Sequence, residues 1–308
     1  MNRMIENPAY RRMLKPHCFS DRIAYLEFMI SFYFNVSLVM KECRHNSQFR
    51  AQMATSAQMM FTKGKAMRQL IEGFNHNIGS LTLKSQPDHT ILYTLVRTAY
   101  EELCVFELLY MIPDTDDKRT IMRNAYIAAA QVNRLRMAAE GGLDKDQENI
   151  AICEQDINDC KNSICATELY KSLTDKDKKK LEDAIFKNGE YQIVITKEGK
   201  VNTHVGWDKV RGYCQLGTDV LGGFYRYACN MAHPSYLGLQ QFCEAYKEND
   251  IEKLSETAMM QMISIMSVYI MDFMKEFPEA KQAYDILDEE SQFMVRMYSE
   301  AFRNASNK

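Results

Sequence analysis

The residues best suited to chemistry lie in one short stretch, "YRYACNMAHPSYLGL", residues 225–239. Arg226 and His233 are seven residues apart, so on a helix they share one stripe, about 10 Å apart along the axis. Asn230 lies between them. An imidazole that titrates near neutral pH can transfer protons, and a guanidinium can hold a phosphate or stabilise charge developing on it. This pair is the minimum set of groups for cleaving RNA without a metal ion, with the 2′-hydroxyl as nucleophile and a cyclic phosphate as product.

Packing explains the same residues without any chemistry. His233 precedes Pro234 at an expected helix end, where an imidazolium would interact favourably with the helix dipole. The long side chain of Arg226 can lie along an apolar surface with its charge in water. At this point the sequence leaves a catalytic and a structural interpretation open.

A second polar pair interrupts an apolar helix in "LVRTAYEELCVFELLY", residues 95–110. Arg97 and Glu101 are four residues apart and therefore share a helix face. One interpretation is a surface ion pair worth a few tenths of a kcal/mol. In the other, Arg97 points into a polar cleft and Glu101 orients its guanidinium. Because buried charges need partners, we expect Arg97, Glu101, Arg226 and His233 to converge on one cleft.

Several classes of enzyme are not indicated. The chain has no GxxxxGK[ST], GxGxxG, HExxH or GxSxG motif. Its six histidines are far apart in sequence, and none has a ligand-type residue at the spacing used by helix-bundle metal sites. We therefore predict neither a metal nor a cofactor.

Composition indicates a cytoplasmic protein. The formal net charge is −3, from 38 basic and 41 acidic residues, so any nucleic acid would bind a local patch. The nine cysteines form no CxxC pair, which is typical of thiols in a reducing cytosol. The N-terminal residues contain no apolar run like a signal peptide. The apolar stretch 258–273 is shorter than a membrane span, so we expect a buried core helix and no membrane association.

These residues must be positioned by helices. Apolar residues recur at helical spacing over 23–40, 49–71, 91–112 and 121–137. Further helices are expected over 147–171, 209–215, 219–232, 237–246, 251–277 and 289–304, and after Thr174, whose hydroxyl is well placed as a cap. Only "EYQIVITKEGKVNTHVGW", residues 190–207, alternates like strands around a turn. We predict an all-α multi-helix bundle, a single domain over 1–308, with a small β-hairpin insertion at about 190–206.

Arg, six residues, then His resembles the Arg-x(4–6)-His motif of the HEPN superfamily of helical proteins. That superfamily includes many metal-independent ribonucleases of bacterial stress and phage-defence systems. Residues 50–245 are also similar to a bacterial helical family of unknown function, in which an Arg-x3-Glu helix precedes a Tyr-rich helix ending in His-Pro-Ser. The resemblance implies catalytic roles for Arg226 and His233, support or binding by Asn230, Arg97 and Glu101, RNA as a partner, and a homodimer. Tyr227 departs from the nuclease pattern, which commonly has a polar residue after the motif arginine.

Three hypotheses follow. The chain is a metal-independent endoribonuclease, a non-catalytic helical module that binds a nucleotide, RNA or a protein partner, or a structural protein in which Arg226 and His233 satisfy one another. A positive patch at Arg226 would favour the first two. A closed apolar environment for His233 would favour the third.

Overall fold

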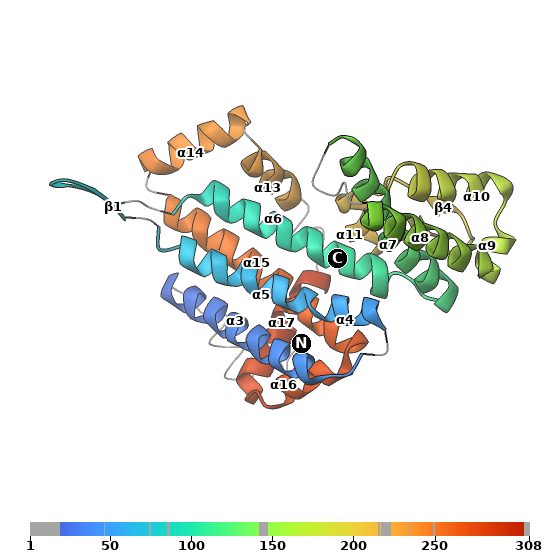
Figure 1. Cartoon of the computed structure of the whole chain (residues 1–308). Helices are drawn as coiled ribbons and strands as arrows, with labels where there is room; N and C mark the ends of the chain where they lie inside the picture. Colours follow the sequence, from blue (N-terminus) through green and yellow to red (C-terminus); the bar gives the residue numbers. More distant parts are fainter. Residues whose placement is uncertain are drawn as a thin grey trace. The chain divides into compact units, whose positions relative to one another are not determined.

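The structure is a computed structural model that describes residues 19–45, 47–73, 75–84, 87–141, 147–214, 216, 223–233, 235–248 and 250–304. It confirms the all-α class with a small hairpin insertion (Figure 1). The helices in chain order are α3 (Phe19–Glu42), α4 (Gln48–Ala54), α5 (Ser56–Leu70), α6 (His89–Phe106), the π-helix η1 (Glu107–Met111), α7 (Asp116–Ala139), α8 (Gln147–Ala166), α9 (Glu168–Ser172), α10 (Asp175–Glu182), the π-helix η2 (Asp183–Lys187), α11 (Trp207–Tyr213), α13 (Phe224–Ala232), α14 (Tyr236–Glu248), α15 (Ile251–Glu276), the 3-10 helix η3 (Pro278–Ala280), α16 (Lys281–Asp285) and α17 (Glu289–Asn304).

The chain folds as two compact units. Unit 1 combines the described parts of Met1–Leu103 and Gln215–Lys308, and unit 2 is Cys104–Cys214. The first boundary falls inside α6. The candidate site residues all belong to unit 1: Arg97, Glu101, Arg226, Asn230 and His233. The single domain over 1–308 stays a prediction, because compactness alone does not show whether the two units fold together.

The core of unit 1 forms around α15, which packs against α3, α5 and α17. The Tyr33 hydroxyl of α3 donates to the Met266 carbonyl at 2.6 Å inside this core. Gly64 of α5 allows close approach, since a Cβ there would lie 3.1 Å from Met266 Cε. The carboxylate of Asp272, 1% exposed, pairs with Lys275 and with Arg303 of α17. This pairing satisfies a charge that would otherwise be costly to bury.

The predicted hairpin at 190–206 is present in a short form. Strand β3 (Val194–Ile195) pairs antiparallel with β4 (Val201–Asn202). A second hairpin was missed: β1 (Asn75–Ile78) pairs with β2 (Leu81–Lys84) and extends away from the helices (Figure 1). Gly79 in its turn has φ +60°. The signal was the Gly79-Ser80 dipeptide between short runs containing β-branched residues, which is typical of a two-residue hairpin turn.

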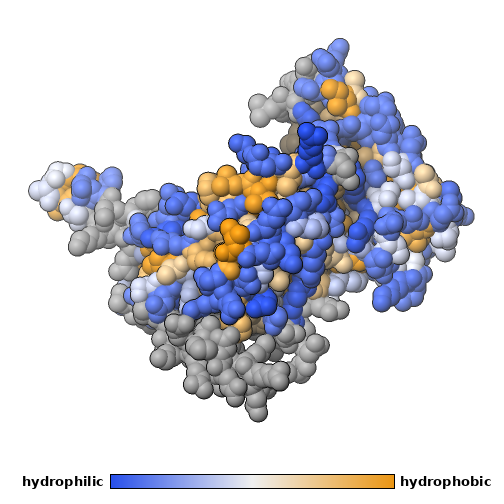
Figure 2. All heavy atoms as spheres, turned by 90° about the horizontal axis from the view of Figure 1, so that it is seen from below, coloured by the Kyte–Doolittle hydropathy of each residue, from blue (hydrophilic) through white to orange (hydrophobic). Residues whose placement is uncertain are grey.

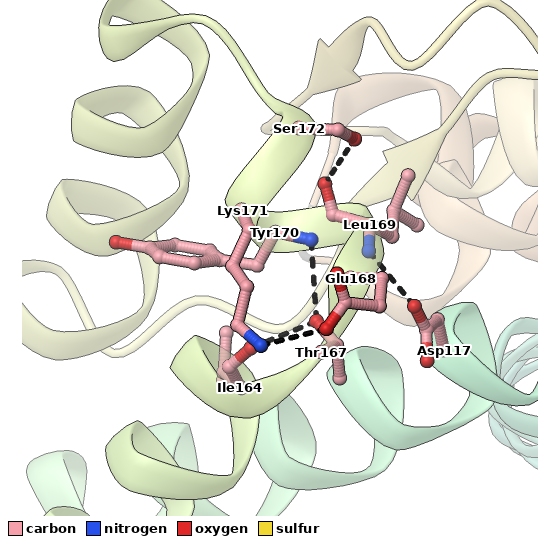
Figure 3. A network of polar contacts seen from close by, with 8 residues as sticks. All are labelled: Asp117, Ile164, Thr167, Glu168, Leu169, Tyr170, Lys171 and Ser172. Atoms are coloured by element: carbon pink, nitrogen blue, oxygen red, sulfur yellow. Dashed lines mark hydrogen bonds and ion pairs between the residues drawn. The ribbon is translucent and has the colours of Figure 1, made fainter.

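Two of the predicted helices are each divided into two shorter helices in the structure. The helix expected over 49–71 divides at Thr55 into α4 and α5. The helix expected over 147–171 ends at Ala166, and Thr167 caps α9 by accepting from Tyr170 N at 3.2 Å (Figure 3). Asp117 of α7 accepts from Leu169 N at 2.8 Å in the same network. The long-range bond to Asp117 stabilises a corner that helical periodicity does not indicate.

Among the described helices, α3 and α15 are long and apolar enough to cross a membrane. The apolar window of α15 is 72% buried, as in a core helix. The window of α3 is 39% buried, and its Phe34 and Leu38 side chains are 50% and 47% exposed. On the face seen from below, apolar patches lie between hydrophilic residues (Figure 2). Length and composition alone are weak evidence for a membrane span, because core helices share both.

Candidate functional site

The ion pair predicted on α6 is present. Arg97 Nε donates to Glu101 Oε1 at 3.0 Å, and the two side chains are 22% and 26% exposed. Burial opposes the charge of Arg97, but the hydrogen bond and attraction of Glu101 outweigh it and raise the pKa of the guanidinium. Arg97 is therefore a fixed cation at the edge of unit 1, with its plane oriented by Glu101.

His233 meets this arginine. The helix α13 ends at Ala232, and His233 has an extended backbone with φ −104° and ψ 147°. Its Nε2 lies 2.9 Å from Arg97 Nη1. Because a guanidinium can only donate, Nε2 must accept, which requires an imidazole without a proton on Nε2. The contact therefore fixes the tautomer with the proton on Nδ1.

Tyr225, which the sequence did not single out, joins the same cluster. Its hydroxyl donates to Glu101 Oε1 at 2.8 Å, so this oxygen accepts from both Tyr225 and Arg97. Burial and the bond to the Glu101 carboxylate raise the pKa of Tyr225, which keeps the hydroxyl a donor. The Arg97 Cζ also lies 5.9 Å from the centre of the Tyr225 ring. Sequence spacing carried no signal for a contact between positions so far apart.

The other two predicted residues lie outside the cluster's hydrogen-bond network. Arg226 is exposed and forms no hydrogen bond or ion pair with any residue that the structure describes. The seven-residue spacing predicts that Arg226 and His233 share one helix stripe, but His233 leaves the helical conformation and its side chain does not follow that stripe. Asn230 is half-buried, and its backbone carbonyl accepts from Ser235 Oγ at 2.8 Å. Pro234 and the first part of the expected helix 219–232 lie outside the described residues.

The corner between α13 and α14 is held by a cap. Gly238 N donates to Ser235 Oγ at 3.0 Å, so Ser235 satisfies an amide in the first turn of α14. A Cβ on Gly238 would lie 2.9 Å from the Asn230 carbonyl oxygen, so glycine permits this close approach. The cap and the glycine therefore set where α14 begins relative to His233.

A pocket of about 550 Å³ opens beside His233 and is lined by residues of α13, α14 and the beginning of α6. This volume is within the range of small-molecule sites. The polar groups that line it are the Thr90 and Ser235 hydroxyls and His233, whereas aromatic and aliphatic side chains form the rest. The described lining residues are Thr90, Met231, Ala232, His233, Ser235, Tyr236, Gly238, Leu239 and Phe242.

One buried polar group lies directly behind this wall. His89, next to Thr90 in the chain, is 0% exposed, and its ring stacks on Phe242 with centroids 5.9 Å apart. Neither ring nitrogen has a hydrogen-bond partner among the described residues. Burial lowers the pKa of His89, against the opposing effect of Asp88. The histidine is therefore held neutral behind the pocket.

The cluster offers a fixed cation and an imidazole beside a mostly apolar pocket. Such groups can bind an anion and move a proton. In the part of the chain that the structure describes, no group of three His, Cys, Asp or Glu side chains is placed to hold a metal ion.

Comparisons of the chain with models of protein families, with curated proteins and with solved structures find no match.

Proposed function

We propose that the chain is a HEPN-like endoribonuclease of a bacterial stress or phage-defence system that cleaves RNA without a metal ion. The observation that supports this proposal most directly is the contact between Arg97 Nη1 and His233 Nε2 at 2.9 Å. It pairs a phosphate-binding group with a proton-transfer group at the edge of a pocket.

In the proposed reaction, a phosphate of RNA binds the guanidinium of Arg97. Arg97 then releases His233, because its Nη1 donates to a phosphate oxygen in place of the imidazole. The freed Nε2 takes the proton of the 2′-hydroxyl, whose oxygen attacks the phosphorus. The bond to the 5′-oxygen breaks, that oxygen receives the proton that the imidazole took, and the product has a 2′,3′-cyclic phosphate. Charge on the phosphorane is stabilised by arginine.

The proposal assigns Arg226 to RNA or to a second copy of the chain. Arg226 is exposed and hydrogen-bonds to no described residue, so its guanidinium is available to a ligand. The homodimer follows from the resemblance to the HEPN superfamily, in which the motif helices of two protomers face each other.

The test is cleavage of single-stranded RNA by the purified protein in EDTA. We expect products with a cyclic phosphate, and losses of about a hundredfold or more for His233→Ala and a comparable factor for Arg226→Ala and Arg97→Ala. His76→Ala is the matched control, because His76 is exposed on the hairpin β1–β2. Intact RNA with a folded wild type, or cleavage that survives His233→Ala, would overturn the proposal.

A second candidate function is binding without cleavage. It is favoured by one observation: Arg97 occupies the lone pair of His233 Nε2 that a general base needs. A module of this kind would bind single-stranded RNA or a nucleotide with an affinity that falls in Arg97→Ala, while the RNA stays intact in every buffer. The same EDTA assay, followed by a binding measurement, separates the two functions.

A further inference from the structure

The pocket beside His233 has two chemically different sides. Its wall contains the apolar side chains of Met231, Leu239 and Phe242. His233, at its edge, contacts the guanidinium of Arg97. A ligand that fills it should therefore have a flat or apolar part and an anionic part. Polar groups within the pocket are few, as in sites that take a ring and orient it through a small number of hydrogen bonds.

The wall carries apolar side chains that water reaches. Tyr236 is 81% exposed and Leu239 is 61% exposed, and both line the pocket. Exposed aromatic rings are a common platform on which proteins stack the bases of single-stranded nucleic acids. Phe242, half-buried and stacked on His89, forms a fixed part of the same wall.

The guanidinium of Arg97 has one nitrogen that is not engaged in a hydrogen bond with a described residue. Arg97 Nε is engaged by Glu101 and Nη1 by His233. Nη2 donates to no described residue, and 22% of the Arg97 side chain is exposed. Phosphate oxygens could accept from Nη2, and from Nη1 once His233 is released, without breaking the ion pair between Nε and Glu101, which would keep the guanidinium oriented.

We propose that this pocket is the base-binding subsite of the protein, in which the base of a nucleotide packs on Tyr236 and Leu239 and its phosphate binds Arg97. The inference rests on the proposed function in placing the phosphate at Arg97, and it adds the chemical class that occupies the pocket. The hydroxyl oxygens of Thr90 and Ser235 can each still accept a hydrogen bond from the base or the ribose.

The test is calorimetric titration of the full chain with adenosine monophosphate, adenosine and inorganic phosphate. Adenosine monophosphate should bind more tightly than either half alone, because it contacts both the wall and Arg97. Tyr236→Ala should weaken its binding about tenfold or more, and Leu239→Ala should weaken it to a smaller extent. Arg97→Ala should bring its affinity down to that of adenosine.

Matched controls come from the chain itself. Leu237→Ala removes a leucine of α14 that is 42% exposed and is not among the described lining residues. Tyr213→Ala removes a tyrosine of unit 2 that is 42% exposed. Both should leave the affinity unchanged. No binding of adenosine monophosphate at millimolar concentration, or an equal loss in Tyr236→Ala and Tyr213→Ala, would overturn the inference.

RNA cleavage measured on the same samples separates this inference from the proposed function. Cleavage by a wild type that does not bind adenosine monophosphate would leave the ribonuclease proposal standing and remove the subsite. Binding with the expected pattern of losses, but with intact RNA, would support the subsite and remove the cleavage reaction.

Discussion

Among single residues, His233 is the one whose tautomer the chemistry depends on. The contact with Arg97 requires Nε2 to accept and leaves the proton on Nδ1. We expect long-range ¹⁵N–¹H correlation spectra at pH 7.5 to show the Nδ1–H form in the wild type. In Arg97→Ala the constraint is lost, so the Nε2–H form should become populated.

His204 is the internal control for this measurement. Its Nδ1 lies 3.0 Å from Glu190 Oε2 in unit 2, so its signals should be the same with and without Arg97. An Nε2–H form of His233 in the wild type would contradict the contact and, with it, the proposed release of the base.

One carboxylate organises the cluster, and its neighbour in the chain has a different partner. Glu101 Oε1 accepts from Arg97 and Tyr225, which come from α6 and α13. Glu102 serves another face, where it pairs with Lys63 of α5. Burial raises the pKa of Glu102, with Lys63 opposing the rise. The two adjacent carboxylates therefore have different roles: Glu101 orients groups of the site, and Glu102 pairs with Lys63 where α5 packs against α6.

Among the elements, the attachment of α14 to the start of α6 should depend on pH. Burial lowers the pKa of His89 beneath Phe242, so the folded state binds this proton less readily than the unfolded chain does. His89 therefore adds stability above its unfolded pKa of about 6.5. That contribution is lost as the pH falls from there through the folded pKa, with a slope of up to about 1.4 kcal/mol per pH unit.

Urea unfolding followed by circular dichroism at pH 7.5, 6.0 and 5.0 measures this contribution. His89→Phe keeps a ring against Phe242 and removes the titration, so its free energy of unfolding should fall less on acidification than that of the wild type. His76→Phe, on the exposed hairpin, should behave as the wild type does. Parallel pH profiles for wild type and His89→Phe would refute the assignment.

In the molecule as a whole, the two units can be followed separately. Trp207 is the only tryptophan of the chain and lies in unit 2, so its fluorescence reports on that unit. Gly189 has φ +67°, and a Cβ there would lie 2.6 Å from Asn133 Oδ1. Gly189→Ala should lower the free energy of unfolding of unit 2 by about 2 to 3 kcal/mol, from left-handed strain and the clash together.

Gly199→Ala is the matched control, because Gly199 has φ +79° but no atom closer than Leu173 Cδ2 at 4.0 Å. Strain without a clash should cost about 1 kcal/mol. Equal losses for the two variants would contradict the role given to Asn133. If the units unfold separately, part of the circular dichroism transition should stay unmoved in Gly189→Ala.

The features that were predictable from the sequence are those that local physics controls. Helical periodicity predicted the core helix over 251–277, and alternation predicted a hairpin at about 190–206, whose paired strands lie within 194–202. The cap at Thr174 is confirmed, since its hydroxyl accepts from Asp177 N at 3.1 Å. The pairing of Arg97 with Glu101 also followed from spacing alone, because residues four apart meet on any helix.

Tertiary packing, in contrast, determines which distant residues meet. Arg97 contacts His233 across 136 positions, and Tyr225 contacts Glu101 across 124. The expected partner, Arg226, lies on the same helix as Tyr225, but it makes no hydrogen bond to the cluster among the described residues. Spacing specifies a helix face, whereas the meeting of two helices depends on how they pack, and His233 leaves the helical conformation where α13 ends.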